Sequence, residues 1–87
     1  MSKPALKVSE WDLLHDQWAE TEIAHNAAWR EYLQISDAVT AKRAAALRGH
    51  PEASPSVDEL DRVREAKSRW EAISRELAAL SERMTRV

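Results

Sequence analysis

Two histidines that each follow an acidic residue by three positions are the first candidates for chemistry: His15 after Asp12 and His25 after Glu22. On a helix such pairs share one face, and Glu-x-x-His is the unit that di-iron carboxylate bundles use. Those sites also need carboxylates from a facing helix, whereas we expect Leu80 and apolar neighbours to face His25. We therefore predict no metal site and no cofactor, and interpret His25 as half-buried between helices. A carboxylate–histidine metal protein around Glu22 and His25 is kept as an alternative.

No group of residues has the pattern of an enzyme active site. The sequence contains no nucleophile elbow, no glycine-rich phosphate loop and no triad-like context around its Ser and His residues. It also contains no cysteine, which excludes a disulfide and a thiolate zinc site. We therefore expect a non-enzymatic protein.

Basic residues gather around the middle of the chain, where they offer a weak nucleic-acid site. The residues assigned to it are Lys42, Arg43, Arg48, Arg62 and Arg64. Five acidic residues between positions 52 and 65 nearly cancel this charge, and the whole chain carries a net charge of −2. Such a balance is typical of a solvated helix surface, so nucleic-acid binding is an alternative function and not the preferred one.

A long amphipathic run supplies the element that would position these residues. Apolar side chains recur at helical spacing between Trp11 and Leu47 and share an arc roughly 160° wide. Ser9 suits the N-cap of this helix, and Gly49 suits the position after its C-cap. We predict a first helix over about residues 10–48. A polar pair at Ser36-Asp37 leaves open a break there, which would give a three-helix bundle.

The rest of the chain predicts a turn and a second helix. Residues 49–55 contain one Gly and two Pro, and Ser56 with Glu59 fits a capping box that would start a helix over about residues 56–86. Its apolar residues follow a heptad pattern, so its stripe is one coiled-coil seam wide. All 87 residues thus form one domain, an all-α antiparallel hairpin. Level pairing about the turn would set Trp18 opposite Val87 and Ile35 near Trp70.

The first helix also predicts a contact with a partner. Its stripe is wider than one neighbouring helix needs, and level pairing leaves Trp11 and Leu14 beyond the end of the second helix. Together with Trp18 and His25, these are the predicted partner-binding residues. A chain of 87 residues without disulfides commonly gains stability by oligomerisation. We therefore expect a homodimer in which two hairpins form a four-helix bundle.

The sequence favours a function in protein–protein interaction, as an adaptor, chaperone-like or regulatory protein that works through an apolar helix face. It has no apolar run of 18 residues and no apolar core of signal-peptide length after its first residues. We therefore expect a cytoplasmic location and no contact with membranes.

Overall fold

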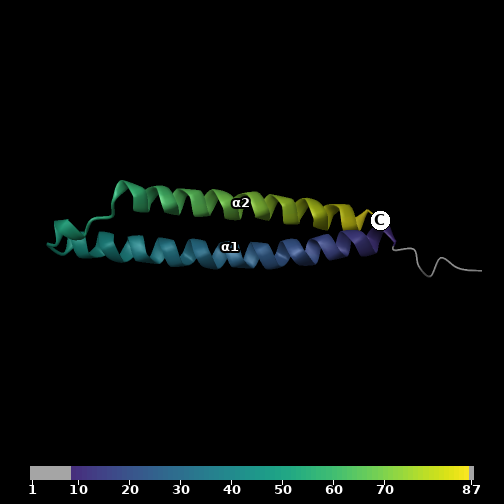
Figure 1. Cartoon of the computed structure of the whole chain (residues 1–87), viewed down its shortest axis with the longest axis horizontal. Coiled ribbons are helices and arrows are strands. Elements are labelled where there is room, and N and C mark those ends of the chain that lie inside the picture. The colour runs from purple at the N-terminus through teal and green to yellow at the C-terminus, as the bar shows by residue number, and fades with distance from the viewer. Residues whose placement is uncertain (1–8, 87) are drawn as a thin grey trace, which may run out of the picture.

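The computed structural model describes residues 9–86 and shows two long antiparallel helices joined by a short connection (Figure 1). Helix α1 spans Glu10–Leu47, the 3-10 helix η2 spans Pro51–Ala53, and helix α2 spans Val57–Thr85. The described residues contain no strand. The predicted helical hairpin is thus confirmed, while residues 1–8 and Val87 lie outside the described residues. None of the described helices is long and apolar enough to cross a membrane.

Helix α1 is continuous through Ser36 and Asp37, so the three-helix alternative is wrong. Ser and Asp have only a modest cost inside a helix, and packing on either side of them outweighs it. Ala28 and Val39 are 7% and 5% exposed, which places the flanking turns firmly against α2. The polar pair is therefore held within one helix.

Both helices start at the predicted caps. The Ser9 hydroxyl accepts from the backbone N–H of Asp12 at 3.1 Å. At the start of α2, the Ser56 hydroxyl accepts from the N–H of Glu59 at 3.1 Å, and the Glu59 carboxylate accepts from the N–H of Ser56 at 2.9 Å. Each such cap satisfies backbone donors that the first turn leaves free, and contributes about 1 kcal/mol.

Helix α1 ends in a Schellman motif. The N–H of His50 donates to the carbonyl of Ala45 at 3.1 Å, and the N–H of Gly49 donates to that of Ala46 at 3.3 Å. Gly49 has a φ of 102°, a left-handed conformation that disfavours any residue with a Cβ. This conformation turns the chain sharply back, so that η2 packs against α1.

The register between the helices differs from the level pairing predicted above. Trp18 contacts Ser81 instead of Val87, and His25 contacts Ser74 instead of Leu80. Each partner lies six positions earlier in α2 than predicted. Because η2 takes up the space beside the last turn of α1, α2 begins further back along α1, as the view in Figure 1 shows. Helix α2 therefore extends further along the first turns of α1 than level pairing allows.

The core of the hairpin is a single thin layer of side chains along this seam. Its buried apolar residues are Leu14, Ala28, Val39, Ala66 and Leu80. No large side chain among residues 9–86 is less than 2% exposed. Two of the five core residues are alanines, so the seam buries little apolar area. The hairpin therefore depends strongly on each of its few large core residues.

Replacing Leu80 by Ala tests this dependence. Leu80 is 6% exposed, and its truncation should lower the free energy of unfolding by about 2–5 kcal/mol because it removes buried methyl groups and leaves a cavity. The matched control is Leu13→Ala, since Leu13 is 53% exposed and its truncation should cost less than about 0.5 kcal/mol. Urea unfolding followed by circular dichroism measures both. Equal losses for the two variants would contradict the assignment of the core.

Candidate interaction surface

Two polar pairs seven residues apart mark one side of the seam between α1 and α2. The Trp18 Nε1–H donates to the Ser81 hydroxyl at 3.0 Å, and His25 Nε2 lies 2.8 Å from the Ser74 Oγ. Seven residues are close to two helical turns, so both pairs lie on the same side of the hairpin. We call it the aromatic side, because the aromatic residues of both helices gather there.

An open groove occupies the end of the aromatic side near the start of α1. Trp11 stacks on His15 with ring centroids 4.9 Å apart, and His15 lies 6.2 Å from the ring of Trp18. Residues of α2 complete the groove, which is lined by Trp11, His15, Trp18, Ser81, Met84 and Thr85. Trp11 remains 43% exposed there. The end of the hairpin thus offers an apolar, aromatic hollow to solvent.

A second aromatic cluster lies at the middle of the hairpin, around Trp70. The Trp70 ring lies 4.7 Å from Trp29, 5.9 Å from His25 and 6.2 Å from Tyr32 between centroids. Trp29 nevertheless stays 37% exposed, and Leu33, one turn further along α1, is 38% exposed. Aromatic contacts of this kind contribute about 0.5–1.5 kcal/mol beyond area burial. Trp29 therefore contributes to the hairpin and still presents apolar surface outward.

The opposite side of the seam carries polar interactions between the two helices. Arg69 forms an ion pair with Glu31, and the Thr21 hydroxyl donates to the Glu76 carboxylate at 3.4 Å. These groups are satisfied within the chain, whereas the exposed aromatic rings on the other side are only partly covered. The two sides thus differ in chemistry, and the aromatic side is the candidate contact surface.

The structure sorts the four predicted partner-binding residues into different environments. Trp11 is exposed, while Trp18 and His25 are half-buried and hydrogen-bonded to α2. The prediction that Leu14 lies uncovered is wrong, because the six-residue change in register brings the end of α2 against it and leaves it 5% exposed. Trp29 was not among the predicted partner-binding residues, although it is 37% exposed.

The acid-x-x-His spacings do not build a larger ligand set among residues 9–86. No group of three or more His, Asp or Glu side chains comes together there in a way that holds a metal ion. His25 instead uses Nε2 for its contact with Ser74, and His15 packs its ring against Trp11.

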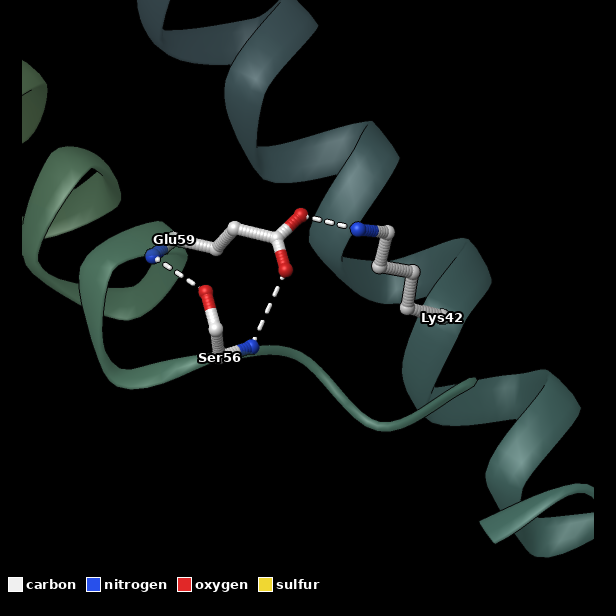
Figure 2. Close-up of polar contacts among 3 residues, drawn as sticks. All are labelled: Lys42, Ser56 and Glu59. Atoms are coloured by element: carbon white, nitrogen blue, oxygen red, sulfur yellow. Dashed lines mark hydrogen bonds and ion pairs between the residues drawn. The ribbon is translucent and has the colours of Figure 1, made fainter. Parts of the chain in front are cut away.

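The basic residues at the hairpin tip divide into paired and unpaired groups. Lys42 forms an ion pair with Glu59, as Figure 2 shows, and Arg64 pairs with Asp61 at 2.8 Å. The remaining predicted nucleic-acid residues have no ion pair within residues 9–86: Arg43, Arg48 and Arg62. Two of the five cations are thus engaged within the chain, which weakens the basic patch.

Glu59, in the first turn of α2, connects α2 to Lys42 of α1 (Figure 2). The hydrogen bond from Lys42, followed by that from the Ser56 backbone N–H, lowers the pKa of Glu59 from its ordinary 4.5 to about 2. The same carboxylate thus caps α2 and ties it to α1.

Comparison with known proteins finds no matching family model, no matching curated protein and no matching solved structure. The function is therefore inferred from the surface of this chain alone.

Replacing Lys42 by Met should raise the pKa of Glu59 part of the way back toward 4.5, because the Ser56 N–H remains. A carboxylate with a depressed pKa stabilises the fold above pH 4.5, and this contribution is lost as the pH falls toward about 2. The variant should therefore lose less stability over that interval than the wild type. NMR titration of the Glu59 carboxyl carbon measures the shift, and Lys67→Met is the control. A wild-type Glu59 that titrates near 4.5 would contradict the assigned contact.

Proposed function

We propose that the chain is a non-enzymatic interaction module that binds protein through the aromatic side of α1. The observation that carries the proposal is the exposure of Trp29 and Leu33, 37% and 38%, next to each other at the middle of the hairpin. Residues four apart on a helix are neighbours on its surface, so the two side chains form one apolar contact point. Trp is among the residues that most often dominate the energy of protein interfaces.

The polar groups of the aromatic side support a role in binding more than a role in catalysis. Trp18 Nε1 and His25 Nε2 each form a hydrogen bond with a hydroxyl of α2, which fixes the orientation of the rings. A surface with oriented aromatic rings loses little side-chain entropy when it binds, which favours affinity. An adaptor, chaperone-like or regulatory role would use such a rigid helical face.

Self-association into a four-helix bundle by coiled-coil packing is part of this proposal. The alternative of nucleic-acid contact at the tip has weaker support, since Lys42 and Arg64 already pair with acidic residues. A cytoplasmic location remains a prediction from the sequence.

A photoreactive amino acid at position 33 tests the proposal in the native cell. Leu33 lies on the aromatic side, so irradiation should attach the chain covalently to a protein, either another copy or a different one. The control position is Ile23, which is 69% exposed but lies on another face of α1. The adduct should form from position 33 and be absent, or at least tenfold weaker, from position 23. Equal adducts from both positions, or none from position 33, would contradict the proposal.

A further inference from the structure

We propose that the aromatic side of each hairpin binds a second copy of this chain, with the two α1 helices antiparallel about a two-fold axis at Trp29. This inference rests on the proposed function and names the partner of the same surface. A two-fold contact requires one patch that is complementary to itself. Three features of α1 meet that requirement.

The first feature is the spacing of exposed apolar residues along α1. Trp11, Trp29 and Leu47 are separated by 18 residues each, and their exposures are 43%, 37% and 89%. Eighteen residues are five full turns at 3.6 residues per turn, so the three side chains lie on one straight line, roughly 27 Å apart. A two-fold axis at the middle residue sets Trp29 against Trp29 of the second copy. It also sets Trp11 of each copy opposite Leu47 of the other.

The second feature is the groove that Leu47 of the second copy would enter. The groove at the start of α1 is lined by Trp11, His15 and Trp18, with Met84 from α2. Leu47 is the most exposed of the large apolar side chains in the described chain. Insertion of a side chain into a hollow between several residues of the facing helices is the packing that coiled coils and helix bundles use. The exposed leucine and the open aromatic groove therefore fit each other at the symmetric position.

The third feature is charge. An axis at Trp29 places residues 10–20 of one copy opposite residues 38–48 of the other. Residues 10–20 contain four acids and no Lys or Arg, whereas residues 38–48 contain three bases and no acid. Antiparallel packing thus sets an acidic segment of one α1 beside a basic segment of the other at both ends of the contact, while parallel packing would set segments of like charge side by side. Complementary charge of this kind selects the orientation of the partner.

The position of the line on α1 also suits a four-helix bundle. Ala28 is 7% exposed and faces α2, and the adjacent Trp29 points about 100° away around the helix axis. In such a bundle each helix packs against two neighbours on adjacent sides. Helix α2 occupies one of these sides, and the line through Trp29 is the other.

Sedimentation equilibrium of the Leu47→Asp variant tests the contact without disturbing the hairpin, because Leu47 is 89% exposed within its own chain. The wild type should sediment as a dimer. The variant should dissociate at least roughly 30-fold more readily, because a charge replaces a side chain buried at the interface. Ile23→Asp is the control and should remain dimeric, since Ile23 lies outside the line. A monomeric wild type, or equal weakening by the two variants, overturns the inference.

Thiol crosslinking tests the orientation, and the chain has no native cysteine to interfere. The axis sets His15 of one copy opposite Arg43 of the other. A mixture of the His15→Cys and Arg43→Cys variants should therefore crosslink with a short thiol-reactive reagent. Neither variant alone should do so, since identical positions are 28 residues, or roughly 42 Å, apart across the dimer. Crosslinking of either variant with itself indicates parallel helices and overturns the inference. A monomeric chain that still forms an adduct with a different protein from position 33 leaves protein binding by the aromatic side intact and overturns self-association and this assignment of the partner.

Discussion

One helix can cover only one flank of another, and this constraint governs the hairpin. The apolar stripe of α1 is wider than the seam of α2, so α2 buries Leu14, Ala28 and Val39 and leaves the flank with Trp29 and Leu33 partly exposed. A domain of this size buries only about 60% of the surface that its unfolded chain exposes. With one thin layer of core side chains, the hairpin has a clear physical reason to use the exposed flank for a further contact.

The helices and their ends could be predicted from local signals in the sequence. Ser9, Ser56 and Glu59 occupy cap positions whose hydrogen bonds depend on residues three apart, and Gly49 adopts the backbone conformation that favours glycine. The register could not be predicted this way. It depends on how η2 packs on the last turn of α1, which is a contact between segments and not a property of either one.

The candidate surface was predictable in part. The half-buried His25 follows from the helical pattern. Level pairing predicted that both Trp11 and Leu14 are uncovered, but the six-residue displacement of α2 buries Leu14, while Trp11 stays 43% exposed. Trp29 belongs to the wide apolar arc of α1, and helical periodicity alone does not distinguish it from the buried residues of that arc. Its spacing of 18 residues from both Trp11 and Leu47 is a signal present in the sequence that a heptad reading does not detect.

The ion pairs of the hairpin help to set how α1 and α2 are oriented and contribute little to the stability of the fold. The pairs Glu31–Arg69 and Lys42–Glu59 join side chains that are partly or largely exposed, and exposed pairs contribute about 0–1 kcal/mol each. The stability of the fold must then come mainly from apolar contact within the chain and, under the proposed self-association, between two copies. Urea unfolding over a hundredfold range of protein concentration tests this most directly. If the second copy completes the core, each tenfold increase in concentration should stabilise the folded dimer by about 1.4 kcal/mol, and the unfolding midpoint should rise. A midpoint that stays constant across the whole range would contradict the account.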